Sequence, residues 1–278
     1  MTNGGTLRPE DYEEPQCLLC GMPKAGEPVQ AIPQQRIREK LDEYMSRRDY
    51  AGVERHLRYW LEEAKANRDL RGELMVVNEM VGHYRKMGDR ENALRCGDAA
   101  LKLLEALEFE DNLSAATTFV NVATARNAFG ENETALPLFR KARAIYEASP
   151  HTSPDLLGGL YNNMALTCTA LGRYEDAMAL YDLAMEKMAA VPGGALEQAI
   201  TCLNRADTLT ARDGAEQTEQ SVRELLDQAW DLLRDPTVPR DGYYAFVCEK
   251  CAPAFGYYGY FLAADTLERE AKEIYERT

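Results

Sequence analysis

One pattern recurs three times in this chain at a fixed spacing of 42 residues. Each copy consists of a glycine followed five and twelve residues later by alanine, and the copies begin at Gly88, Gly130 and Gly172. A repeat period in this range is typical of solenoid proteins, in which each repeat buries its apolar face against its neighbours. The period therefore predicts an all-α repeat protein with an extended surface suited to holding another molecule.

The glycines and alanines of this pattern have a simple physical role. A glycine just after a helix can adopt the left-handed conformation that ends the helix and reverses the chain. Small alanines at matched positions let neighbouring helices approach closely, while larger apolar residues fill the space between them. The pattern therefore predicts helix pairs joined by short turns at the three glycines, with a weaker first repeat turning at Arg48-Asp49-Tyr50.

The two ends of the chain depart from this regularity. Residues 1–35 are rich in proline and glycine and lack helical periodicity, which predicts an irregular tail containing two cysteines, whereas residues 36–278 are predicted to form about six repeats. In the fifth repeat, four extra residues are expected to lengthen the turn around Gly214. In the sixth, Pro253 is expected to kink the first helix or to delay its start.

Eight aromatic residues lie close to Pro253 in the sixth repeat. We interpret them as core and capping residues, and a ligand pocket is the alternative. They are Tyr243, Tyr244, Phe246, Phe255, Tyr257, Tyr258, Tyr260 and Phe261.

The fourth repeat is the clearest copy. It reads Leu160-Tyr-Asn-Asn-Met-Ala165, then Leu171-Gly172-Arg-Tyr-Glu-Asp-Ala177. This sequence resembles a tetratricopeptide repeat, and the resemblance extends over residues 36–278. The 42-residue length and the paired asparagines are similar to repeats of kinesin light chains and of Gram-positive receptors for signalling peptides. The resemblance implies a right-handed superhelix, a concave groove lined by the first helices, and the role of an adaptor or bacterial-type regulator that binds a peptide or a protein segment.

Asparagines recur at one register of the predicted first helices. Asn121 and Asn163 lie nine residues before the turn glycine, and Asn204 is at the equivalent position of the fifth repeat. Asparagine is unfavourable inside a helix, and its amide both donates and accepts hydrogen bonds, as an extended peptide requires. The resemblance implies the same use. The predicted peptide-binding residues are these three together with Asn78, Asn127, Asn162, Leu166 and Asp207.

A second interpretation of the asparagines stays open. Their amides could instead bond to the adjacent repeat and fix its stacking. Three amides that each make one or two hydrogen bonds, at about 1 kcal/mol per bond, contribute roughly 3–6 kcal/mol, less than the roughly 8 kcal/mol that micromolar binding needs. Side-chain pockets must therefore supply the remainder of the affinity if a peptide binds here.

Cysteines form two pairs with two-residue spacing. Cys17 and Cys20 resemble half of a structural zinc site, which needs four ligands, so a further ligand pair or a homodimer would have to complete it. The alternatives are a redox-active thiol pair or two thiols without a function. Cys248 and Cys251 fall at registers where the other repeats have core residues, and we expect them to be buried.

Composition and missing motifs exclude several functions. A net charge of −14 disfavours nucleic acids and anionic membranes as partners. The sequence contains no nucleotide-binding, hydrolase or metalloprotease motif, so we expect no enzymatic activity and no cofactor other than the zinc considered above. A cytoplasmic location is expected because no signal peptide or spanning segment is present. A self-associating scaffold and a zinc- or redox-responsive adaptor remain as alternative functions.

Overall fold

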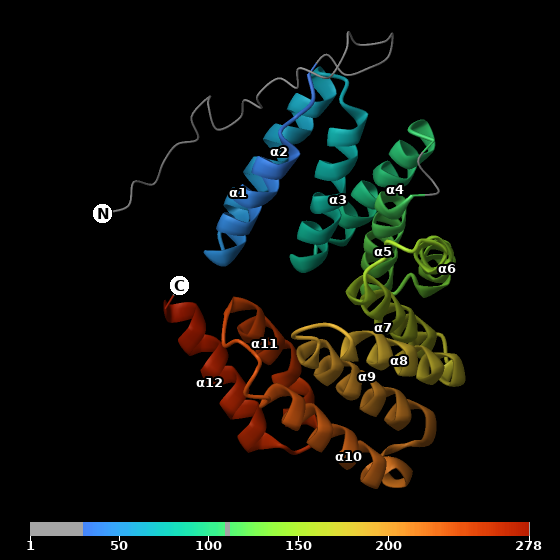
Figure 1. Cartoon of the computed structure of the whole chain (residues 1–278), viewed down its shortest axis with the longest axis vertical. Coiled ribbons are helices and arrows are strands. Elements are labelled where there is room, and N and C mark those ends of the chain that lie inside the picture. Colours follow the sequence, from blue (N-terminus) through green and yellow to red (C-terminus); the bar gives the residue numbers. More distant parts are fainter. Residues whose placement is uncertain (1–29, 109–111, 278) are drawn as a thin grey trace. The chain divides into compact units, whose positions relative to one another are not determined.

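The computed structural model describes residues 30–108 and 112–277, which form twelve helices (Figure 1). The chain divides into two compact units, Met1–Phe129 and Gly130–Thr278. The described part of the first unit contains α1 (Gln34–Ser46), α2 (Tyr50–Ala66), α3 (Leu70–Lys86), α4 (Arg90–Ala106) and α5 (Leu113–Ala128). The described part of the second contains α6 (Asn132–Ala148), α7 (Pro154–Ala170), α8 (Tyr174–Ala189), α9 (Ala195–Asp213), α10 (Ala215–Leu233), α11 (Gly242–Tyr257) and α12 (Phe261–Arg277).

The helices follow the predicted order of helix, short turn, helix. In the first unit α1 packs on α2 and α3 on α4, and in the second α7 packs on α8, α9 on α10 and α11 on α12. The unit boundary falls inside the third repeat, between α5 and α6. The predicted all-α fold of paired helices is therefore confirmed for the described residues. The cysteine-containing tail predicted for residues 1–35 lies almost entirely outside them.

The turns within the repeats have the predicted conformation. Gly88, Gly130 and Gly172 have φ angles of +70°, +80° and +70°, in the left-handed region that glycine adopts without steric cost. Arg48 takes the same conformation in the first repeat, with φ of +54°. An aspartate caps two of the helices that follow these turns, α2 and α4; in α4, Asp89 accepts a hydrogen bond from the Asn92 N–H at 3.0 Å.

Alanine allows close helix packing in both units. The alanines five and twelve residues after the turn glycines are all fully buried. They are Ala93, Ala100, Ala135, Ala142, Ala177 and Ala184. Larger side chains such as Phe139, Tyr146 and Tyr181 fill the remaining core, so the two sizes interdigitate as the sequence predicts.

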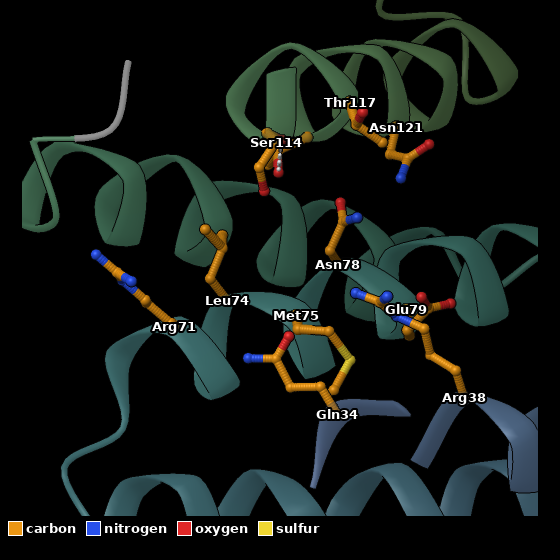
Figure 2. Close-up of a pocket in the computed structure, with 11 residues that line it drawn as sticks. Gln34, Arg38, Arg71, Leu74, Met75, Asn78, Glu79, Ser114, Thr117 and Asn121 are labelled. Carbon is orange, nitrogen blue, oxygen red and sulfur yellow. Dashed lines mark hydrogen bonds between the residues drawn. The ribbon is translucent and has the colours of Figure 1, made fainter. Parts of the chain in front are cut away.

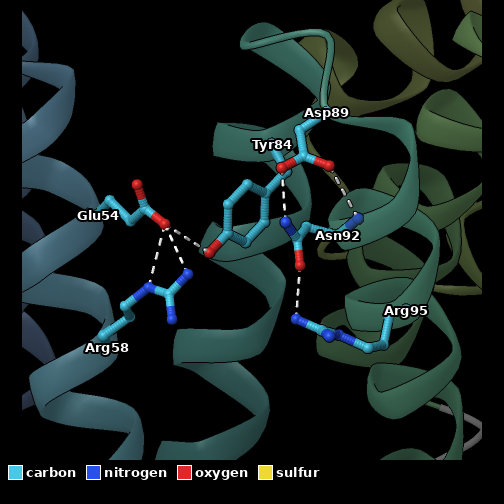
Figure 3. A network of polar contacts seen from close by, with 6 residues as sticks. All are labelled: Glu54, Arg58, Tyr84, Asp89, Asn92 and Arg95. Carbon is cyan, nitrogen blue, oxygen red and sulfur yellow. Dashed lines mark hydrogen bonds and ion pairs between the residues drawn. The ribbon is translucent and has the colours of Figure 1, made fainter.

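A polar network joins the first two repeats. The Tyr84 hydroxyl of α3 donates to Glu54 Oε1 of α2 at 3.1 Å, and Arg58 donates to the same oxygen at 2.8 Å (Figure 3). These contacts lower the pKa of Glu54, with the Arg58 hydrogen bond as the largest cause. The network therefore holds a carboxylate that is charged at neutral pH between α2 and α3.

The predicted long turn of the fifth repeat is wrong. Only Gly214, with φ of +87°, separates α9 from α10, and both helices have 19 residues where most of the others have 16 or 17. The added residues extend the two helices because the segment around Gly214 is rich in Ala, Glu and Gln, which favour helix.

Of the two outcomes predicted for Pro253, a kink of the first helix or a late start, the late start is wrong. α11 begins at Gly242 and continues through Pro253. Proline has no backbone N–H, so Pro253 cannot donate a hydrogen bond to the carbonyl of Glu249, four residues earlier. Both residues are exposed, so that carbonyl lies on the solvent side of the helix.

Candidate functional site

The first helices of the first unit enclose a hollow. We call the surface formed by α1, α3 and α5 the first-helix face of this unit, and apply the same name to α7, α9 and α11 in the second. The hollow has a volume of about 590 Å³. It is lined by Gln34 and Arg38 of α1, by Arg71, Leu74, Met75, Asn78 and Glu79 of α3, and by Ser114, Thr117, Thr118 and Asn121 of α5 (Figure 2).

Two of the predicted asparagines meet at this hollow. Figure 2 shows the Asn78 side chain extending from α3 toward α5, where Asn121 lies. The Asn78 Oδ1 atom is buried and accepts no hydrogen bond from any residue that the structure describes. A buried acceptor without a donor costs about 1–3 kcal/mol and is rare in folded proteins. A ligand N–H in the hollow would supply the missing donor if the Asn78 amide turned toward it.

Charged groups of both signs line the same hollow. Arg38 and Arg71 contribute cations, and Glu79 contributes a carboxyl group. Loss of hydration raises the pKa of Glu79; Arg38 opposes this rise and Asp42 adds to it. The hollow therefore offers hydrogen-bonding amides, two guanidinium groups and a carboxyl group whose protonation is favoured by its surroundings.

The first-helix face of the second unit uses its asparagines differently. Asn162 is buried, and its Oδ1 accepts hydrogen bonds from Asn204 Nδ2 at 3.0 Å and from the Thr201 hydroxyl at 3.2 Å. These are bonds between α7 and α9, in successive repeats. Asn162 and Asn204 thus make the contacts that the stacking interpretation predicts. Contact of either residue with a peptide stays a prediction.

Further hydroxyl contacts extend this connection along the second unit. Thr169 of α7 pairs with Thr208 of α9 at 2.8 Å. The Tyr258 hydroxyl, just after α11, donates to Asp207 of α9 at 2.8 Å. Loss of hydration raises the pKa of Asp207, and the Tyr258 hydrogen bond opposes the rise. Asp207, a predicted peptide contact, is therefore already bound to its neighbouring repeat.

The three remaining predicted peptide-binding residues lie on α7 and α5. Asn163 and Leu166 are half-buried on α7, and Asn127 is half-buried on α5. Their contact with a peptide stays a prediction. Arg71 and Ser114 were not predicted, although each lies seven residues before an asparagine of the hollow. A spacing of seven residues places side chains on one helix face, so this signal was present in the sequence.

The cysteines divide into two groups. Cys248 and Cys251 are buried, as predicted, and loss of hydration raises the pKa of Cys251 to about 12 and that of Cys248 to about 11. Such thiols stay protonated at neutral pH and are poor metal ligands. In the described segments no three His, Cys, Asp or Glu residues are grouped to hold a metal ion. Cys17 and Cys20 lie outside these segments, so zinc binding there stays a prediction.

Comparison with known proteins agrees with this architecture. Residues 73–148 match the family model of the tetratricopeptide repeat. The structure of BtubC (BKLC) from P. vanneervenii superposes with a TM-score of 0.52 at 17% identity, covering 82% of this chain and 90% of that one. The chain has the tetratricopeptide-repeat fold.

A second solved structure supports the same fold. The nearly identical TPR-like repeats of a Podosopora anserina kinesin light chain superpose with a TM-score of 0.50 at 17% identity, covering 72% of this chain and 94% of that one. No curated protein sequence matches the chain. Repeats of this kind generally mediate contacts between proteins and typically serve as non-catalytic scaffolds. None of the helices in residues 30–108 and 112–277 combines the length and apolar character needed to span a membrane.

Proposed function

We propose that this protein is a non-enzymatic adaptor that binds an extended peptide segment of another protein on the first-helix face of its first unit. The observation that carries the proposal is the buried, unpartnered Asn78 Oδ1 in the hollow beside Asn121. An extended peptide presents N–H and C=O groups in alternation, which is the pattern that asparagine amides can pair with. Leu74 and Met75 supply apolar contact area beside these amides.

Side-chain contacts must add to the amide bonds. The asparagine bonds alone fall short of micromolar affinity, so we assign the remainder of the binding free energy to apolar contact with Leu74 and Met75 and to the charges of Arg38 and Arg71. Because Arg38 and Arg71 outnumber Glu79 in the hollow, a peptide with a carboxylate among its side chains is favoured over a strongly basic one. A cytoplasmic location is part of this proposal, and the five free cysteines among the described residues support it.

Gly82 provides a steric test of this site. It lies on α3 four residues after Asn78, hence on the same helix face, and a Cβ added there meets nothing within 4 Å. Gly82→Leu should fill space beside the hollow while improving helix propensity by about 1 kcal/mol. Loss of binding in this variant is therefore separable from loss of folding.

The experiment selects peptides from a displayed random library on the wild-type protein and measures their dissociation constants for three variants. We expect Gly82→Leu and the double variant Asn78→Ala/Asn121→Ala to bind about ten-fold or more weakly. Loss of two hydrogen bonds costs about 1–3 kcal/mol of binding free energy, and about 1.4 kcal/mol is a ten-fold change in the dissociation constant. Lys102→Leu, an exposed position on α4, is the control and should bind like the wild type. Equal binding by all variants, or a library without binders, would contradict the proposal.

A further inference from the structure

Large apolar side chains are exposed together at the turn between α11 and α12. Tyr257, Phe261 and Leu262 are 75%, 67% and 85% exposed, respectively. Phe261 and Leu262, with Trp230 of α10, line a hollow of about 730 Å³. We call Tyr257, Phe261, Leu262 and Trp230 the apolar edge. Contiguous exposed apolar surface of this kind marks an interaction site more often than a structural need.

The other repeats show that the fold does not require apolar residues at this turn. The second and third residues after the turn glycine are Phe261 and Leu262 in the sixth repeat. The same two positions are occupied in the second, third and fourth repeats by Arg90-Glu91, Asn132-Glu133 and Tyr174-Glu175. Only the sixth repeat places two apolar side chains here among these four, so their exposure is a property of this repeat and not of the scaffold.

The apolar edge is held in place by the residues between its members. The Tyr258 hydroxyl donates to Asp207 at 2.8 Å, and the Tyr260 hydroxyl donates to Asp227 at 3.0 Å. The Trp230 ring packs edge-on against Phe255 with centroids 6.0 Å apart. Because the turn is fixed in this way, a partner would meet an ordered surface, which lowers the entropic cost of binding.

Carboxylates border the apolar edge on α10. Glu224, Asp227 and Asp231 of α10, with Asp235 just after it, line a second hollow of about 580 Å³, and the hydrogen bond from Tyr260 to Asp227 connects this hollow to the apolar edge. Two nearby cations are each paired with a carboxylate: Arg223 with Glu219 at 2.9 Å, and Arg234, which lies over the Trp230 ring, with Glu270 at 2.7 Å. Exposed Asp265 and Glu268 extend the negative charge onto α12. The surface therefore combines an apolar centre with an acidic rim.

We propose that the apolar edge and its acidic rim bind a cationic amphipathic segment of a partner protein. Its apolar side chains would lie on Phe261 and Leu262, and its lysines or arginines would face Asp227 and Asp231. A second copy of this chain fits less well, because a symmetric contact would place two acidic rims together. An anionic membrane would be repelled by the same rim. This site lies in the second unit, shares no residue with the hollow of the first unit and does not depend on the function proposed above.

The test uses a synthetic peptide of about 18 residues, five helical turns, with leucines on one face and lysines on the other. Binding of the labelled peptide to the full chain is measured by fluorescence anisotropy. The double variant Phe261→Ser/Leu262→Ser should bind about ten-fold or more weakly. Asp231→Asn/Glu224→Gln should bind several-fold more weakly, and added salt should reduce this difference. Because all four positions are exposed, these variants are expected to fold normally.

Matched controls separate this site from general attraction of a basic peptide to an acidic protein. Phe246→Ser removes another exposed aromatic of α11 and should leave the affinity unchanged. A scrambled peptide of equal charge but without an apolar face should bind about ten-fold more weakly. Equal binding of the scrambled peptide, or unchanged binding by Phe261→Ser/Leu262→Ser, would overturn the proposal. It would also be overturned by light scattering that shows a dimer dissociated by the same double variant, because the occupant would then be a second copy.

Discussion

The first-helix faces of the two units contain asparagines at related registers but use them in opposite ways. In the second unit Asn162 accepts two hydrogen bonds from α9, so its acceptor is satisfied inside the protein. In the first unit Asn78 borders a hollow and its buried Oδ1 accepts none from the described residues. The same side chain therefore connects repeats in one unit and has an unsatisfied acceptor in the other.

The two units also differ in which residues adopt left-handed φ angles in their turns. Among the described residues, the non-glycine residues with left-handed φ angles are Arg48, Arg68 and Glu108, all in the first unit. The turns within the repeats of the second unit, which correspond to the Arg48 turn, have glycine, for instance at Gly172 and Gly259. A left-handed conformation costs a non-glycine residue about 1–2 kcal/mol. The second unit thus meets its local conformational and hydrogen-bonding requirements more completely, while the first leaves both partly unmet.

This contrast predicts unequal costs for one substitution made in both units. Asn162→Ala should lower the free energy of unfolding by about 2 kcal/mol, because it removes an acceptor shared by two donors. Asn78→Ala should cost close to nothing or stabilise, because the acceptor it removes is unpartnered and alanine favours helix. Urea unfolding followed by circular dichroism measures both. Similar losses in the two variants would show that the faces do not differ in this respect.

The sequence was sufficient to predict the repeat architecture because glycine and alanine act locally. A glycine after a helix and an alanine in a helix contact have the same effect in every copy, so their period located most helix pairs and the buried alanines. The fifth repeat was the exception. Its added residues are good helix formers. Ala206 aligns with Ala165 of the fourth repeat at an offset of 41 residues and Ala229 with Ala184 at 45, which reveals an insertion without revealing whether helix or turn absorbs it.

The candidate site was predictable only in part. Register alone placed Asn78 and Asn121 on the first-helix face, where they border one hollow. It could not show that Asn162 bonds to the next repeat, because that depends on how closely α7 approaches α9. The eight aromatics were interpreted as core and capping residues, and the core part was correct for Tyr244 and Phe255, which are fully buried. It was wrong for Tyr243, Phe246, Tyr257 and Phe261, which are exposed. Aromatic residues suit both cores and interfaces, so composition does not separate the two uses.

A smaller effect should distinguish the carboxyl groups of the two faces. Loss of hydration raises the pKa of Glu79, so folding favours its protonated form. Glu79→Gln should therefore be more stable than the wild type at pH 7. The difference should shrink as the pH falls through the raised pKa and disappear below the usual value of 4.5, where the carboxyl is protonated in both states. Urea unfolding at several pH values measures this difference.

Asp207 is the matched carboxyl group in the second unit. Its pKa is also raised by loss of hydration, but its hydrogen bond from Tyr258 opposes the rise. Asp207→Asn should therefore gain less stability at pH 7 than Glu79→Gln. A larger gain for Asp207→Asn would mean that the second face does not satisfy its polar groups better than the first.

The smallest expected effect concerns the turns. Arg68 is exposed and has a φ angle of +56°, so Arg68→Gly should relieve the left-handed strain at the cost of a more flexible unfolded chain. We expect a net gain of about 0.5 kcal/mol, or roughly 1–2 °C in the thermal midpoint. The reverse change in the second unit, Gly172→Ala, should cost about 1 kcal/mol through strain alone, because its added Cβ meets nothing within 4 Å. Thermal unfolding of both variants decides the point: if Arg68→Gly destabilises, the first unit's turns are not strained, and the difference between the units is confined to their polar side chains.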